Sequence, residues 1–137
     1  MPEKMDLEGL QQAALYTPLA GQVLAQLDAC FDRAACAVAA RCAPSGKLDA
    51  RRLDANQGAC YELALAKADL LAASVFLNGA ARSTDLDRAL ACAFACEVLE
   101  NVIGRLQAVY LECAMDATEL HALAASADVH RVRLACG

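Results

Sequence analysis

The sequence predicts an all-α protein, and three observations support this prediction. Alanine and leucine, which favour helices most strongly, are its two commonest residues. Aromatic residues make up only 4% of the chain and β-branched residues are few, which disfavours a sheet. Apolar residues also recur at intervals of three and four, as they do on one face of a helix. The 137 residues have the length of one domain.

The net charge of −5 disfavours nucleic acid as a partner. A protein that binds phosphate backbones needs a basic face, whereas the Lys and Arg residues are scattered here. The polar, acidic start, Met1–Asp6, does not resemble a secretory signal. The longest apolar runs, Ala34–Ala40 and Ala89–Cys96, are far shorter than the roughly 20 residues that span a bilayer. We therefore expect a cytoplasmic protein without a membrane or nucleic-acid partner.

Turn signals divide the single domain into a lead segment, residues 1–17, and four helices within residues 18–134. The lead segment is expected to form a helical turn or two over Asp6–Leu15. The first long helix is predicted over Pro18–Arg41, with Thr17 as its N-cap. The predicted core stripe of this helix is Val23, Leu27, Cys30, Phe31, Ala34 and Val38.

The second helix is predicted over Ala50–Asn78, where Asn78 and Gly79 supply a stop signal. Its predicted core seam is Ala59, Leu63, Ala66, Leu70, Ala73 and Leu77. Apolar residues also cover much of its remaining surface, and the polar residues form one narrow strip that includes Lys67 and Ser74. A helix that is apolar nearly all round is buried on more than one side.

The third helix is predicted to begin at Ser83–Asp85 and to end near Cys113, with Thr84 and Asp87 as a capping box. Its predicted seam is Cys92, Leu99, Val102, Leu106, Val109 and Cys113. The fourth helix is predicted over Ala117–Leu134. Four helices joined by short turns indicate an antiparallel four-helix bundle preceded by a short helical segment.

The eight cysteines are interpreted as free thiols, because most lie within helical patterns and the chain can build a core without disulfides. Cys92 and Cys96 lie one helical turn apart, so their sulfur atoms share a face. Thiolates in this arrangement can bind a soft metal such as Cu(I). With Cys30 or Cys113 across the core, they support a second hypothesis, a metal-binding or thiol redox bundle. The simpler interpretation is that they are small core residues.

No complete catalytic motif is visible in the sequence. His121 and His130 belong to neither a zinc nor a di-iron motif and are expected at the surface. Glu97, Glu100 and Glu112 have no partner motif at a matching spacing, so a solvated face explains them as well. We therefore predict no catalytic residue.

Three segments of the second and third predicted helices have a pattern that is typical of one family. They are Leu53–Gln57, the Ala/Leu-rich Glu62–Phe76 and the alanine-rich Leu90–Val102. Over about Pro18 to Tyr110, the chain resembles the C-terminal helical domain of acyl-CoA dehydrogenases. The resemblance implies a bundle that makes dimer and tetramer contacts and lines part of an FAD site.

The resemblance implies that Arg41 and Gln57 are the candidates for any retained cofactor contact. The two domains that precede this one in acyl-CoA dehydrogenases have no counterpart before Pro18, and the family's catalytic glutamate has no match. Because a base must take the α-proton of a thioester, we expect neither catalysis nor a bound cofactor in the isolated chain.

The first functional hypothesis is therefore a non-catalytic accessory module. Its expected partners are a second copy of the chain or a larger flavoprotein subunit. FAD, and the chemistry of an acyl-CoA dehydrogenase-like oxidoreductase, are expected only within such an assembly.

Overall fold

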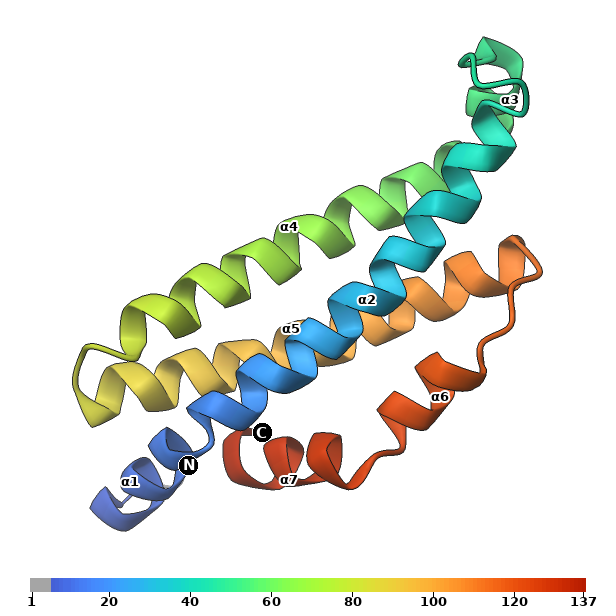
Figure 1. The fold of residues 1–137 in the computed structure, drawn as a ribbon. Helices are drawn as coiled ribbons and strands as arrows, with labels where there is room; N and C mark the ends of the chain where they lie inside the picture. The colour runs from blue at the N-terminus through green and yellow to red at the C-terminus, as the bar shows by residue number, and fades with distance from the viewer. Residues whose placement is uncertain (1–5) are drawn as a thin grey trace, which may run out of the picture.

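The computed structural model describes residues 6–137, and these residues form an all-α structure of seven helices without a strand. In chain order the helices are α1 (Leu7–Leu15), α2 (Thr17–Cys42), α3 (Ala50–Ala55), α4 (Gln57–Ala80), α5 (Asp85–Glu112), α6 (Thr118–Ala124) and α7 (Ala127–Cys136). Figure 1 shows α4 and α5 side by side as an antiparallel pair, with α2 packed against both. The all-α prediction is confirmed; the lead segment before Asp6 lies outside the described residues.

The core lies between the three long helices and along the faces that the sequence predicts. Every residue of the predicted stripe on α2 and of the predicted seam on α4 is buried. The predicted seam of α5 is buried except for Cys113, which is partly exposed. Alanines such as Ala34, Ala66 and Ala91 are completely buried where the helices meet. Their small side chains allow the close approach that fills a core at high packing density.

Helix α5, the second helix of the α4–α5 hairpin, begins where it was predicted to begin. The Thr84 hydroxyl accepts a hydrogen bond of 3.2 Å from the main-chain N–H of Asp87. However, the predicted end of the preceding helix is two residues too early. Helix α4 continues past Asn78 to Ala80, so Gly79 lies within its last turn.

The predicted helix over Ala50–Asn78 is interrupted, which corrects the prediction. Asn56 separates α3 from α4, with a backbone conformation outside the helical region. Its side chain is buried and donates a 2.7 Å hydrogen bond to the Arg52 carbonyl. An Asn side chain that bonds to nearby backbone in this way competes with helical hydrogen bonds. The periodic apolar pattern continues across the interruption and does not reveal it.

The predicted helix over Ala117–Leu134 is also interrupted. Helix α6 ends at Ala124, and Ser126 begins α7 by accepting a 3.2 Å hydrogen bond from the N–H of Val129. Two short helices therefore replace the single fourth helix. Both α6 and α7 pack against α2 and α5, and Figure 1 shows that the two short helices run in different directions.

Thr17 does not cap α2, which corrects a further prediction. Tyr16 occupies the N-cap position without a side-chain cap, and the Thr17 hydroxyl instead donates a 2.8 Å hydrogen bond to the Ala14 carbonyl. This bond ties the end of α1 to the start of α2. Helix α1 packs against α5, and the end of α7 reaches the same region (Figure 1).

Candidate functional site

Helix α4 carries an apolar outward face directly opposite its core seam. The exposed residues of this outward face are Tyr61, Ala64, Ala68, Leu71, Ala72, Val75, Phe76 and Gly79. Val75 is 71% exposed and Leu71 is 54% exposed, which are high values for large apolar side chains. Except at Phe76, whose ring packs edge-on against Phe94 of α5 with ring centroids 5.7 Å apart, the face predicted to be buried on a second side is not covered by the described part of the chain.

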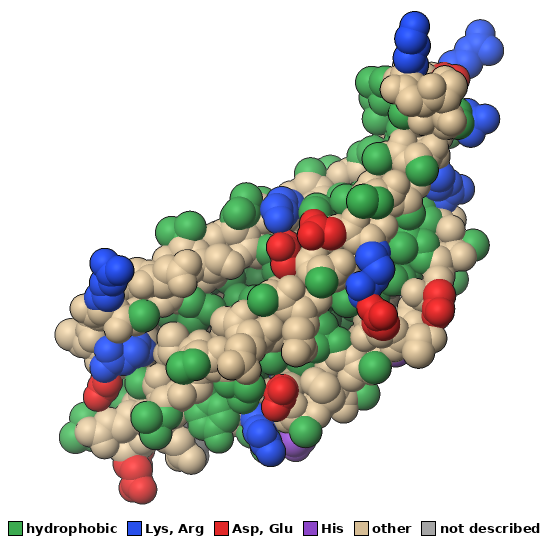
Figure 2. All heavy atoms as spheres, viewed as in Figure 1, with side chains coloured by type: hydrophobic (Ala, Val, Ile, Leu, Met, Phe, Trp, Pro, Cys, Tyr) green, Lys and Arg blue, Asp and Glu red, His purple; other side chains and the backbone are tan. Residues whose placement is uncertain are grey.

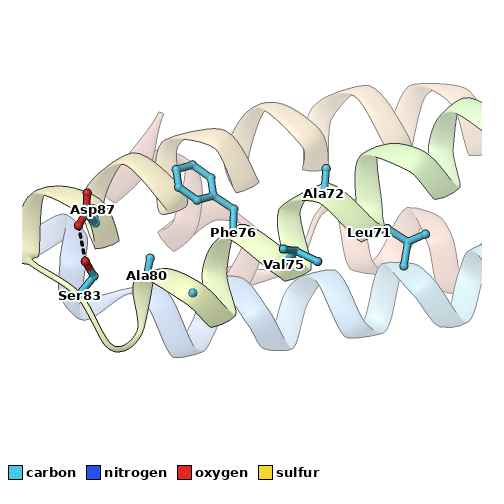
Figure 3. A pocket seen from close by; sticks show the side chains of 8 residues that line it. Leu71, Ala72, Val75, Phe76, Ala80, Ser83 and Asp87 are labelled. Carbon is cyan, nitrogen blue, oxygen red and sulfur yellow. Dashed lines mark hydrogen bonds between the residues drawn. The ribbon is translucent and has the colours of Figure 1, made fainter.

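The last turns of α4 form a shallow groove with the start of α5, shown in Figure 3. It has a volume of about 640 Å³, and its apolar lining is Leu71, Ala72, Val75, Phe76, Gly79 and Ala80. Ser83 and Asp87 lie at one end, where the Ser83 hydroxyl donates a hydrogen bond to the Asp87 carboxylate. Hydrogen bonds from Ser83 and Thr84 lower the pKa of Asp87. Apart from Asp87, the residues that line the groove carry no charge.

Two of the three charged residues of α4 pair with neighbouring helices, and the third, Asp69, is partly exposed one helical turn from Ala72 at the edge of the outward face. Lys67 forms an ion pair of 3.0 Å with Asp28 of α2, and Glu62 forms one of 2.7 Å with Arg105 of α5. Figure 2 shows Lys and Arg side chains gathered around α3, with apolar side chains spread along the length of the molecule. The ion pairs therefore leave the outward face available for apolar contact.

By length and composition, α4 passes the test for a membrane-spanning helix, and it is the single helix among residues 6–137 that does so. Core helices of soluble proteins can have the same length and composition. A third of the most apolar window of α4 is buried in the chain.

Cys92 lies at a junction of three segments. Its buried side chain projects from α5, and its Sγ atom is 3.4 Å from the hydroxyl oxygen of Thr17. Cys136, the last residue of α7, is partly exposed and packs against the same core. The neighbouring Cys136 thiol has the largest influence on Cys92 and lowers its pKa to about 7. The same contact raises the pKa of Cys136, which burial raises further.

Cys96 lies one turn along α5 from Cys92, as the spacing predicts, but in a different environment. Burial raises the pKa of its thiol, and the nearby Glu100 carboxylate raises it further. Cys92 and Cys96 thus share a helix face, while only Cys92 has hydrogen-bond partners that stabilise a thiolate.

Cys30 and Cys113 are not brought to this pair. Cys30 accepts a 3.2 Å hydrogen bond from Arg33, and burial raises the pKa of its thiol. Cys113 lies near Cys60 and Cys42 at the other end of the helices. Within residues 6–137, no three Cys, His, Asp or Glu side chains converge closely enough to hold a metal ion. The ligand set Cys30, Cys92, Cys96 and Cys113 therefore gains no geometric support.

Arg41 and Gln57 are both exposed near the α2–α4 connection. Arg41 donates a 3.0 Å hydrogen bond to the main-chain carbonyl of Glu112, at the end of α5. Gln57 donates one of 3.2 Å to the Asp54 carboxylate. Both side chains thus have structural partners, and these contacts do not indicate a shared ligand.

The histidines and glutamates considered as candidates lie at the surface. His121 and His130 are exposed on α6 and α7. Glu97 is exposed, and Glu100 forms an ion pair with Arg133 of α7. These positions agree with solvated side chains.

No family model matches the chain, and no curated protein matches it. The resemblance to acyl-CoA dehydrogenases therefore gains no support from these comparisons and stays a prediction.

Two features of the site were not predicted from the sequence. Cys136 follows Cys92 by many residues, and no spacing rule connects them. The outward face had a visible signal, since its residues repeat every three or four positions alongside the core seam. That signal indicated a second buried side without showing that neighbouring helices leave it exposed.

Proposed function

We propose that the protein is a non-catalytic assembly module that pairs through the outward face of α4. The observation that carries this proposal is an exposed apolar helix face, from which ion pairs with α5 and α2 hold Glu62 and Lys67 away and which Asp69 borders. Soluble monomers rarely expose contiguous apolar patches above a few hundred Å². The partner proposed is a second copy of the chain, because two-fold dimers are the commonest closed assembly.

The order of large and small residues on the outward face suits an antiparallel copy of α4. If the two-fold axis lies between Ala68 and Ala72, these small residues face each other. Tyr61 then faces Gly79 of the second copy, and Phe76 faces Ala64. Tyr61 and Phe76 thus meet small residues, whereas Leu71 faces Asp69 and Val75 faces Leu65 of the second copy. The exposed positions recur at intervals of three and four, which is the spacing that helix pairs use for interdigitation.

The energetic argument favours association. Each Å² of apolar surface removed from water contributes about 25 cal/mol, while association has its own cost in lost motion. The outward face contains four large apolar side chains, and the partly exposed Asp69 is the charge at its edge. The short-range ion pairs of α4 stay within each copy, so they add no charge to the contact.

We further propose that the fold is an antiparallel four-helix bundle, in which α6 and α7 together occupy the fourth position. The proposed location is the cytoplasm. A larger flavoprotein subunit is the alternative partner that the resemblance implies, and it would occupy the same face. FAD would then belong to the assembly and would not be bound by the chain alone.

The test is the oligomeric state of the purified chain by light scattering and sedimentation at micromolar concentration. We expect a dimer, and we expect Leu71→Glu with Val75→Glu to yield a folded monomer. Leu111→Glu is the matched control, because Leu111 is 84% exposed on α5 and lies outside the face. This control should remain dimeric.

Two results would overturn the proposal. One is a monomer that persists across a hundredfold concentration range. The other is a dimer that survives the Leu71→Glu and Val75→Glu changes. A monomer that binds lipid vesicles through α4 would favour a membrane surface as the partner and would equally reject self-association.

A further inference from the structure

The groove at the end of α4 is apolar along most of its length and polar at one end. Its volume is about 640 Å³, and Ser83 and Asp87 are its only polar lining side chains. The ring of Phe76, which lines the groove, is held edge-on against Phe94 of α5. At the polar end, the Ser83 hydroxyl donates a hydrogen bond to the Asp87 carboxylate (Figure 3). A side chain with an apolar ring and a polar tip matches such a groove.

Gly79 leaves the wall of this groove open. A Cβ atom added at Gly79 would meet no heavy atom within 4 Å outside its own stretch of helix. The backbone of α4 is therefore accessible here, and a ring from another molecule can lie directly against it. A larger residue at this position would fill the space with its own side chain.

Tyr61 lies at the other end of the outward face. Of the large apolar side chains that are exposed within residues 6–137, Tyr61 is the one that carries a hydrogen-bond donor, and it is 63% exposed. Tyr61 and Gly79 are 18 residues apart on one continuous helix, which is five full turns. They therefore lie at the same angle around α4, about 27 Å apart along its axis. A tyrosine side chain is much shorter than this, so Tyr61 cannot enter the groove of its own chain.

We propose that the groove of each copy receives the Tyr61 ring of the second copy, whose phenol hydroxyl donates a hydrogen bond to the Asp87 carboxylate. This inference rests on the proposed self-association through α4 and names the contact that fixes its register. A two-fold axis halfway between Tyr61 and Gly79 makes the contact twice, once in each direction. The same axis lies between Ala68 and Ala72, whose small side chains allow the two helices to approach.

The position of both halves on one helix face favours a second copy as the occupant. In a two-fold interface the same surface patch is used by both copies, so the patch must be complementary to itself. The outward face meets this requirement, because the ring of Tyr61 and the open space at Gly79 have the same angular position on α4. A tyrosine buried in a contact also finds a partner for its hydroxyl, which Asp87 supplies.

Asp87 is well suited to accept this hydrogen bond. The Ser83 hydroxyl bonds to Oδ2, and an ionised carboxylate has acceptor sites on both of its oxygens. Hydrogen bonds from Ser83 and Thr84 lower the pKa of Asp87, so the carboxylate remains ionised at neutral pH. Hydrogen bonds to an ionised acceptor are stronger than those between neutral groups. The contact thus adds a directional bond to an otherwise apolar interface.

A photochemical cross-link tests the position of Tyr61 directly. Residue 61 is replaced by the photoreactive aromatic residue benzoylphenylalanine, and the chain is irradiated at micromolar concentration. Mass spectrometry of the digested product then locates the attachment. We expect a covalent dimer in which residue 61 is attached within residues 75–87 of the second copy. Because the groove of the same chain is about 27 Å away, each such attachment joins two copies.

Gly79→Leu tests the groove without changing Tyr61. The space beside Gly79 is open, so the monomer should fold, and the helix gains from replacement of glycine. We expect the dissociation constant of the dimer to rise at least tenfold, because the added side chain occupies the place of the ring. Gly104→Leu is the matched control. Gly104 lies on α5 in equally open space outside the outward face, so this variant should dimerise like the unchanged chain.

Tyr61→Phe and Asp87→Ala test the hydrogen bond. Each substitution should weaken dimerisation about tenfold, the usual effect of losing a hydrogen bond to a charged group. The double variant should be no weaker than Asp87→Ala alone, because both changes remove the same bond. Tyr16→Phe is the control, since Tyr16 precedes α2 and lies outside the outward face. Circular dichroism checks that every variant is folded.

Three results would overturn this inference. Gly79→Leu dimerises as tightly as the unchanged chain, residue 61 attaches outside residues 75–87, or the effects of Tyr61→Phe and Asp87→Ala multiply in the double variant. If Leu71→Glu with Val75→Glu still dissociates the dimer in these cases, the proposed function holds with a different register. An unchanged chain that is monomeric would overturn both proposals.

Discussion

The Tyr110 hydroxyl of α5 donates a 2.8 Å hydrogen bond to the main-chain carbonyl of Cys30 on α2. Both groups are buried, and the bond joins the two helices near the centre of the core. Burial raises the pKa of Tyr110, so the phenol stays protonated and remains a donor at neutral pH.

Tyr110→Phe should lower the free energy of unfolding by about 1 kcal/mol, the usual net contribution of one hydrogen bond. The Cys30 carbonyl lies within α2 and keeps its helical partner, so the loss should not be larger. Urea unfolding followed by circular dichroism measures the change. A loss above about 3 kcal/mol would mean that the ring position also shifts.

Leu70 and Leu71 are adjacent but lie on opposite sides of α4, with exposed fractions of 3% and 54%. Leu70→Ala should cost about 2–5 kcal/mol of stability, because it leaves a cavity in the core. Leu71→Ala should change the stability of the monomer by no more than about 0.5 kcal/mol. Thermal unfolding at low concentration compares the two variants, and equal losses would contradict the assigned orientation of α4.

The stability of the reduced chain should rise with pH between about 7 and 9. The pKa of Cys92 is lowered from its ordinary 9.0 to about 7 in the folded chain. The folded state therefore loses this proton at a lower pH than the unfolded state, and the stabilisation is lost as pH falls through about 7. The raised pKa of Cys136 acts in the opposite direction only above about pH 9.

Urea unfolding in the presence of reductant at several pH values measures this dependence. Cys92→Ser should flatten the rise, while the exposed Cys36→Ser should leave it unchanged. An equal slope in both variants would assign the pH dependence to other groups.

Removal of metal ions should leave the fold intact. The described residues build their core from apolar side chains, and several helices have side-chain caps. Circular dichroism after EDTA treatment should show unchanged helix content and a cooperative melt. Loss of helix on chelation would support the metal-binding alternative, because metal binding can supply folding free energy.

The purified chain should be colourless and should not oxidise acyl-CoA thioesters. The sequence has no match to the glutamate that takes the α-proton in acyl-CoA dehydrogenases, and Arg41 and Gln57 already bond to protein groups. An absorption spectrum and a dye-coupled assay test this. A bound flavin after expression without a partner would reject the expectation of a cofactor-free chain.

The sequence by itself determined the helical class and the buried faces. Apolar residues at intervals of three and four define one side of a helix whatever its neighbours are, so the seam from Ala59 to Leu77 was predictable. Thr84 was predictable as a cap for the same reason, since its hydrogen bond to Asp87 is local.

Only the tertiary structure decided the interruptions and the site. Asn56 and Ser126 interrupt helices because their side chains form hydrogen bonds with nearby backbone groups. Such hydrogen bonds compete with the backbone hydrogen bonds of a continuous helix. The contact between Thr17 and Cys92 depends on how the start of α2 packs on α5. The outward face of α4 stays uncovered because α2 and α5 occupy its other sides. The contacts of Cys92 and of the outward face join residues far apart in the chain, so no local pattern encodes them, whereas the bonds of Asn56 and Ser126 are local.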